Sequence, residues 1–192
     1  MKILICGAGM VGASIARHLA REGNEVTLID NNPEIIQSIN SALDVRAFHG
    51  HASHPAMLEK AGAYEADMLI AVTHSDEVNM VACQVSKLLY KTPTTICRVR
   101  AGAYLAKPEL FYNRDTVKDL DSLRGFPLDV LISPEHLVTQ HITRLIEYPG
   151  ALQVLEFSKG LTRLVAIRAT EGGPLVGHEL SYLRTHMPKI DT

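Results

Sequence analysis

The chain has 192 residues, a formal net charge of -2 and an apolar fraction of 46%, which suffices for one domain with a sizeable core plus a smaller appendage. The weak charge and the pI near 6.5 give no reason to expect nucleic acid or an acidic membrane surface as a partner. No apolar run approaches the ~18 residues that span a bilayer, and the first strand lacks the flanks of a signal peptide.

The N-terminal stretch predicts a strand, a glycine-rich turn, a helix and a second strand. An apolar strand over Ile3–Cys6 leads into Gly7-Ala8-Gly9-Met10-Val11-Gly12, which has the pattern G-x-G-x-x-G. A helical pattern follows and ends at Gly23. A second apolar strand over Val26–Ile29 then delivers Asp30 at its carboxyl end.

This pattern is typical of a dinucleotide or nucleotide site. Gly7 permits the tight turn, Gly9 lets the backbone approach a pyrophosphate, and Gly12 lets the helix pack close to the sheet. The helix N-terminus favours the phosphates, and Asp30 lies about 20 residues on, where an acid can accept hydrogen bonds from a ribose. The alternative is a tight βαβ turn without a ligand. Asp30 argues against it, and its charge favours NAD over NADP.

Strands and helices continue to alternate along the chain. The expected elements are a helix from Pro33, a strand over Val45–Phe48, a short helix closed by Gly62, a strand over Met68–Val72, a helix capped by Ser75, and strands over Thr94–Val99 and Val130–Ile132. This regularity predicts an α/β fold, a Rossmann-like doubly wound parallel sheet. Ligands bind such sheets outside the carboxyl ends of the strands, where Gly7, Asp30, His51 and Thr73 fall. No regular element is assigned to Ala101–Pro127.

A new helix is predicted to begin with Ser133 as its cap and Pro134 as its first residue, and to end before Pro149. Its apolar stripe indicates core packing, unless it packs on another subunit. Two strand-like runs, a turn and a helix start follow: Leu152–Phe157, Leu161–Ala169, Gly172-Gly173-Pro174 and Glu179.

Two further groups of side chains could carry chemistry. His49, His51 and His54 fit no standard zinc spacing, so we expect a loop that touches ligand or solvent rather than a metal site. Asp76 and Glu77 could act as acid and base, but acids at a helix start usually serve the helix dipole.

Arginine and cysteine side chains lie in or next to the expected core elements. Arg98 and Arg100 are expected to face opposite sides of a strand, either as a solvated edge pair or with one reaching a phosphate. Cys6, Cys83 and Cys97 lie in predicted core elements, which indicates buried, reduced thiols in a cytoplasmic protein.

Several separated motifs support one family assignment. They are the glycine run, Asp30, the loop Gly50-His51-Ala52-Ser53, and the segments AGAYEADMLIAVTHSDEVNMVAC and ISPEHLVTQHITRLIEYPGALQVLEF. Together they resemble the TrkA family, the cytosolic regulatory components of bacterial Trk potassium uptake, which are built from RCK (also called KTN) domains. The resemblance covers nearly the whole chain. Ala101-Gly102 departs from the family's usual Asn/Ser-Pro, and residues 107–127 form a longer segment than usual.

The resemblance implies a Rossmann-like nucleotide-binding lobe over 1–133, a crossover helix over 134–148 and an incomplete C-terminal lobe over 149–192. Because relatives commonly carry a second RCK unit, it also implies an N-terminal fragment. The implied site joins the phosphate turn, a ribose-binding acid and further residues at strand ends: Gly7, Ala8, Gly9, Met10, Val11, Asp30, His51, Thr73, His74 and Arg98. Within it, Asp30 holds the ribose and His51 lies near the base.

The resemblance further implies NAD or NADH as ligand, with ATP or ADP as a competitor for the same cleft. The implied partners are a second copy of the chain, as a dimer or higher oligomer, and a membrane-embedded Trk-type subunit that translocates potassium. The protein would then lie in the cytoplasm, attached to the inner face of the plasma membrane through that subunit.

Two rival classes are an NAD-dependent oxidoreductase and a redox-sensing repressor. A one-domain dehydrogenase would carry a Tyr-x-x-x-Lys pair, and none of the six tyrosines has a lysine four residues on. A repressor would need a basic recognition helix, and none is visible. The regulator is therefore preferred, and no catalytic residue is expected.

Overall fold

The computed structural model describes residues 1–112, 126–157, 161–172 and 176. The chain divides into two compact units, Met1–Glu135 and His136–Thr192. The helix expected from Glu179 and most of the turn at 172–174 lie outside the described residues.

A six-stranded sheet forms the centre of the first unit. Its strands are β1 (Lys2–Cys6), β2 (Glu25–Asp30), β3 (Arg46–His49), β4 (Met68–Ala71), β5 (Thr94–Arg98) and β8 (Val130–Ile132). They lie in the order β3-β2-β1-β4-β5-β8, and every pairing is parallel. The predicted doubly wound parallel sheet is therefore confirmed. β1 lies between β2 and β4, so the direction of winding reverses beside the glycine-rich turn.

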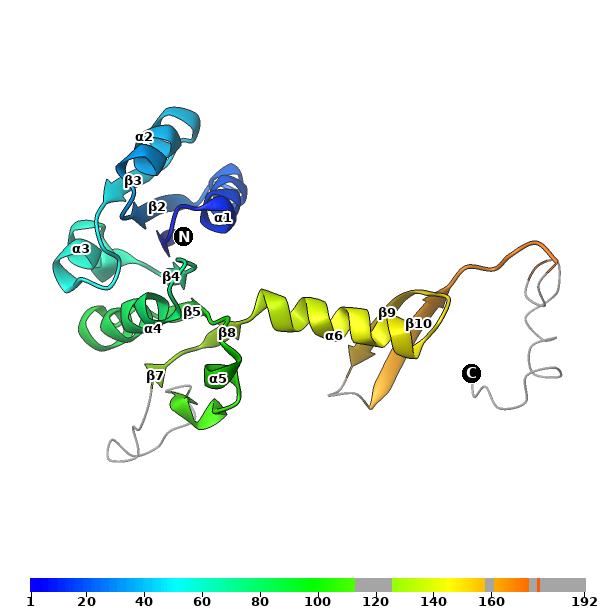
Figure 1. Ribbon diagram of the computed structural model, residues 1–192. Helices are drawn as coiled ribbons and strands as arrows, with labels where there is room; N and C mark the ends of the chain where they lie inside the picture. The colour runs from blue at the N-terminus through cyan, green and yellow to red at the C-terminus, as the bar shows by residue number, and fades with distance from the viewer. Residues whose placement is uncertain (113–125, 158–160, 173–175, 177–192) are drawn as a thin grey trace. The chain divides into compact units, whose positions relative to one another are not determined.

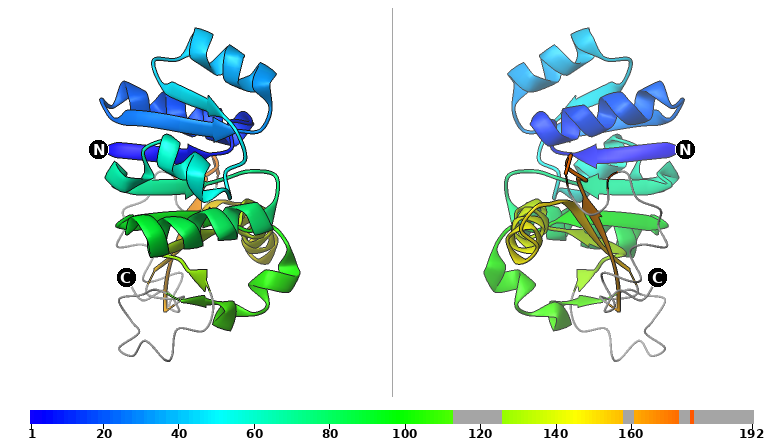
Figure 2. Two further views of the ribbon diagram at one scale, coloured as in Figure 1. Left: turned by 90° about the vertical axis from the view of Figure 1, so that its left-hand side faces the viewer. Right: turned by 90° about the vertical axis from the view of Figure 1, so that its right-hand side faces the viewer.

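Helices cover both faces of this sheet. They are α1 (Met10–Arg21), α2 (Pro33–Ala42), α3 (Pro55–Lys60) and α4 (Asp76–Val85), together with the short 3-10 helix η1 (Ala63–Glu65). One core packs Ala16 and Ile39, from α1 and α2, against Ile5 and its neighbours. The other packs Leu58 and Met80, from α3 and α4, against the opposite face. Figure 1 shows α1 and α3 on opposite sides of the strands, and Figure 2 shows the sheet behind α3 and α4 in one view and behind α1 in the other.

α4 continues as one turn of π-helix, η2 (Ser86–Tyr90). The sequence predicts that Leu88 and Leu89 line the buried side of this helix, and both are exposed instead. The wider π-turn shifts the phase of the side chains, so that Lys87 and Tyr90 face inward.

The edge strand β8 is held by a buried charge cluster. Asp129, just before β8, accepts the Thr95 backbone N–H at 2.6 Å and its hydroxyl at 3.0 Å. The Lys87 ammonium lies 2.7 Å from the same carboxylate, with both side chains mostly buried. Before β8, the region without a sequence assignment forms α5 (Gly102–Leu105), the 3-10 helix η3 (Pro108–Leu110), and a parallel pair of short strands, β6 (Phe111–Tyr112) and β7 (Phe126–Pro127).

α6 (Pro134–Glu147) starts in the first unit and continues into the second. Its start at Pro134 is confirmed, but the predicted cap is wrong, because the buried Ser133 hydroxyl has no hydrogen-bond partner among the described residues. The backbone N–H of Glu135 lowers the pKa of its own carboxyl, and the neighbouring Arg98 lowers it further.

In the second unit an antiparallel hairpin follows α6, formed by β9 (Ala151–Phe157) and β10 (Thr162–Ile167). Arg144 of α6 lies 3.1 Å from Glu156 of β9, which ties the helix to the hairpin. No residue of α6 is buried in the described structure. Among the described helices of both units, none is long and apolar enough to cross a membrane.

Candidate functional site

A cavity of about 540 Å³ opens in the first unit at the carboxyl ends of the strands. Nine of the residues named from the sequence line it: Gly7, Gly9, Met10, Val11, Asp30, His51, Thr73, His74 and Arg98. Ala8 does not line the cavity and contributes through its backbone instead. Arg100, which the sequence offered as an alternative phosphate ligand, also lines it. Sequence reasoning did not assign the other lining residues to the site, namely Ile29, Asn31, Asn32, Ile35, Gly50, Ala52, Val72 and Val78.

The three glycines of the turn have different surroundings. Gly7 has a φ of +101, and a Cβ there would lie 2.8 Å from the Thr73 backbone nitrogen. At Gly12 a Cβ would lie 1.8 Å from the Gly7 carbonyl oxygen, so α1 can approach the turn this closely only because residue 12 has no side chain. A Cβ at Gly9 would meet nothing within 4 Å. Gly7 and Gly12 therefore serve the backbone, whereas Gly9 leaves open space beside the cavity.

Asp30 ties the glycine turn to the start of α2. One carboxylate oxygen accepts the Ala8 N–H at 2.7 Å, and the other accepts the Asn32 N–H at 2.8 Å. Asn32 in turn caps α2 by accepting the Glu34 N–H at 2.9 Å. A carboxylate has about four acceptor positions, so Asp30 can hold this backbone and still accept bonds from a ligand.

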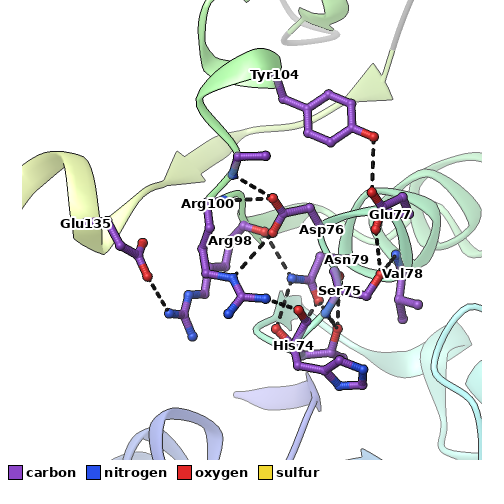
Figure 3. Close-up of polar contacts among 12 residues, drawn as sticks. His74, Ser75, Asp76, Glu77, Val78, Asn79, Arg98, Arg100, Tyr104 and Glu135 are labelled. Atoms are coloured by element: carbon purple, nitrogen blue, oxygen red, sulfur yellow. Dashed lines mark hydrogen bonds and ion pairs between the residues drawn. The ribbon is translucent and has the colours of Figure 1, made fainter.

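Asn79 organises the other side of the cavity, and the sequence analysis did not single it out. Its amide oxygen accepts the Thr73 backbone N–H at 2.8 Å and the Thr73 hydroxyl at 2.7 Å. Its amide nitrogen donates to the Arg98 carbonyl at 3.0 Å. Asn79 is fully buried on α4, and its hydrogen bonds join the end of β5 to the residue that follows β4 (Figure 3). The sequence feature that could have identified Asn79 is a polar residue among apolar ones on the buried side of a helix.

The two arginines both line the cavity, so the expectation that they face opposite sides is wrong. Residues two apart on an extended chain share a face, and Arg98 and Arg100 follow that rule. Asp76 fixes the Arg100 backbone by accepting the N–H groups of Arg100 and Ala101 at 2.9 and 2.8 Å. The Arg100 guanidinium also bonds to the His74 carbonyl (Figure 3). Asp76 is thus a buried support for the backbone after β5.

Glu77 lies beside Asp76 in the first turn of α4 and is exposed. The Ser75 hydroxyl, its own backbone N–H and the Tyr104 hydroxyl lower the pKa of its carboxyl. A carboxyl whose pKa is lowered is ionised at neutral pH. Its charge therefore complements the N-terminal end of the helix dipole.

Of the three histidines His49, His51 and His54, one lines the cavity. His51 lines it, bonds to the Ser53 hydroxyl at 2.9 Å and stacks on His54 at 4.8 Å between ring centroids. His49 contacts the Asn31 carbonyl at 3.1 Å and does not line the cavity. Within the described ranges, no group of three or more His, Cys, Asp or Glu side chains could hold a metal ion.

The three cysteines are free and buried, as predicted. Burial raises the pKa of the Cys6 thiol to about 12, and burial raises that of Cys83 well above its ordinary value. Thiols with such pKa values are protonated at neutral pH, so the cluster packs as apolar core rather than supplying a nucleophile.

The strand order, the glycine-rich turn at the switch point and the acid at the end of β2 define a Rossmann-like domain. The model of the TrkA-N domain family matches residues 3–114. The chain belongs to this family.

Comparison with individual proteins agrees with that assignment. A Trk system potassium uptake protein TrkA from Halomonas elongata is 54% identical over all 192 residues, which span 40% of its length. The TrkA-N domain of the inner membrane protein ybaL from Escherichia coli superposes with a TM-score of 0.60 at 14% identity, covering 76% of this chain and 96% of that one. The Kef C-terminal domain of Shewanella denitrificans, in an AMP-bound form, gives a TM-score of 0.55 at 18% identity, covering 78% and 82%. The two structural comparisons bear on the fold.

Proposed function

We propose that the chain is the nucleotide-binding part of a cytoplasmic regulatory subunit of a Trk-type potassium uptake system. One observation carries the nucleotide part of this proposal, namely that the glycine turn, Asp30 and two arginines line a single cavity. The potassium-uptake part rests on the names of the curated relatives, of which the chain spans about 40%.

The ligand would be NAD or NADH, with the pyrophosphate on the turn at Gly9 and the N-terminus of α1. Asp30 would accept hydrogen bonds from the ribose, and His51 would lie near the base. Ala8 would contribute through the turn backbone, and Met10 and Val11 through the first turn of α1. Thr73, His74 and Arg98 would complete the site at the ends of β4 and β5.

ATP or ADP is the second candidate ligand. The observation in its favour is that Arg98 and Arg100 both line the cavity, because two guanidinium groups suit a ligand with added phosphate charge. AMP belongs in the same comparison, since it is the ligand named for the Kef domain.

The chain would act by binding rather than by catalysis. A ligand shifts a conformational equilibrium only by its different affinities for two states, and the states here would be two arrangements of an assembly. That assembly would sit against a membrane-embedded subunit that translocates potassium. Copies of this chain would pair through α6, whose Leu137, Val138, Ile142 and Ile146 are all exposed, since a contiguous apolar face marks a contact site.

Calorimetric titration of the chain with NAD, NADH, ATP, ADP and AMP tests the ligand. Binding should be abolished in Gly9→Val, which places a branched side chain in the open space at the turn. Unchanged affinity in a folded Gly9→Val variant would mean that the phosphates bind elsewhere. Turnover of NADH with small hydroxy- or ketoacids would support an oxidoreductase instead.

Ligand-dependent potassium flux in vesicles that hold the translocating subunit and the full-length protein tests the regulatory part. Flux that depends on the regulatory protein and ignores every nucleotide would contradict it.

A further inference from the structure

The end of β5 and the start of α6 lie together because of the strand register. Arg98 pairs with Ile132 in the parallel ladder between β5 and β8, and the Val99 N–H donates to the Ile132 carbonyl at 2.9 Å. Glu135 comes only three residues after Ile132, in the first turn of α6. A residue in the first turn of α6 is therefore brought next to Arg98, which lines the cavity.

Arg98 and Glu135 form an ion pair across this junction. The Arg98 Nη2 donates to Glu135 Oε1 at 3.0 Å, and Figure 3 shows the two side chains directed toward each other. Arg98 lines the cavity, whereas Glu135 does not. The Arg98 Nε is buried and has no hydrogen-bond partner among the described residues. The guanidinium has five N–H donors in all, so Arg98 has donors left for a ligand.

The two arginines of the cavity differ in how firmly they are held. Asp76, which is 6% exposed, accepts the Arg100 backbone N–H at 2.9 Å, and its other carboxylate oxygen lies 3.7 Å from the Arg100 Nε. The Glu135 side chain is 53% exposed, whereas that of Arg98 is only 16% exposed. Ion pairs with a solvated partner contribute little, so a ligand phosphate can replace Glu135 as the acceptor more easily than it can replace Asp76.

We propose that Glu135 and a ligand phosphate compete for Arg98, which couples occupancy of the cavity to the first turn of α6. This inference rests on the proposed nucleotide site. With the cavity empty, Arg98 holds Glu135; with a phosphate bound, the guanidinium turns to the ligand and Glu135 is released. Coupling of this kind is reciprocal, so whatever stabilises the ion pair between Glu135 and Arg98 also lowers the affinity for the ligand. α6 carries the change onward, because it continues from the first unit into the second.

The test compares ADP with adenosine, which lacks the phosphates. Glu135→Gln removes the competing charge, so it should tighten ADP binding about two- to fivefold, the range that a weak ion pair supplies. Adenosine affinity should not change. Glu109→Gln is the matched control, because Glu109 is an exposed partner of Lys107 and does not line the cavity. It should leave both affinities unchanged.

An Arg98→Gln background separates competition from a general charge effect. If Glu135 acts through Arg98, Glu135→Gln should have no effect on ADP in that background. A gain that persists without Arg98 would overturn the inference. An unchanged ADP affinity in the single variant would also overturn it, because Glu135 would then not compete with the ligand. A weakened ADP affinity would overturn it as well, because Glu135 would then position Arg98 for the ligand.

Hydrogen exchange of the amides in α6 provides the second readout. ADP should speed exchange near Glu135 in the unsubstituted chain, and Glu135→Gln should show the faster exchange without ADP. Exchange that ADP leaves unaltered would overturn the coupling to α6. If the unsubstituted chain does not bind ADP, both ADP as a ligand and the competition for Arg98 are contradicted. If it binds ADP and Glu135→Gln leaves that affinity unchanged, only the competition is contradicted.

Discussion

Replacing Asn79 by alanine should damage both the fold and the site, because this side chain is fully buried and bridges two strand ends. Two partly buried backbone groups would lose the bond from this side chain, the Thr73 N–H and the Arg98 carbonyl. Each unsatisfied group costs about 1–3 kcal/mol, so the two together give a loss of roughly 2–6 kcal/mol in the free energy of unfolding. The Thr73 hydroxyl adds little, because it also donates to the Ser75 carbonyl.

Urea unfolding followed by far-UV circular dichroism measures this loss. Asn40→Ala is the matched control, since Asn40 is exposed on α2 and gains the same helix propensity, about 0.5 kcal/mol. ADP affinity should also fall for Asn79→Ala under conditions in which the variant is folded. A loss below about 1 kcal/mol, or a change in stability equal to that of the control, would refute the bridging role.

Four further outcomes are expected. Asp30→Ala should weaken NADH binding by roughly 1–3 kcal/mol in calorimetry, and it should also lower the melting temperature of the unliganded chain, because two backbone N–H groups lose their acceptor. Gly12→Ala should prevent folding or lower the melting temperature strongly, whereas Gly9→Ala should leave it unchanged, since only the first places a Cβ against backbone. Aspartate at both Ile142 and Ile146 should convert a dimer into soluble monomers by light scattering, because both positions are exposed in the protomer; a dimer that survives would place the contact elsewhere. The three thiols should not react with Ellman's reagent at pH 8 until the chain is unfolded, because all three are buried.

The βαβ core could be predicted because its information is local. Apolar runs of strand length, helical periodicity and glycines at fixed spacing lie within about thirty residues of one another. The same pattern placed Asp30 at the end of β2, where it lines the cavity. The sequence did not reveal that its carboxylate also supports the turn, because backbone N–H groups leave no trace in residue identity.

The remaining contacts depend on register between distant segments. Glu135 meets Arg98 only because β8 pairs with β5, and nothing in the composition of either segment specifies that pairing. The phase of η2 likewise depends on one extra residue in a turn, which periodicity alone assigns to the wrong face.

The mostly buried Asp129 side chain limits where the first unit can be truncated. The family match ends at residue 114, yet β8 belongs to the same sheet and lies beyond that point. A chain cut there would leave the β5 edge unpaired and the Lys87 ammonium buried without its carboxylate, a loss of about 3–5 kcal/mol. Unpaired edges also promote strand-to-strand aggregation. The smallest piece suited to expression therefore extends past Ile132, because the stretch that the family model matches ends before the last strand of the sheet.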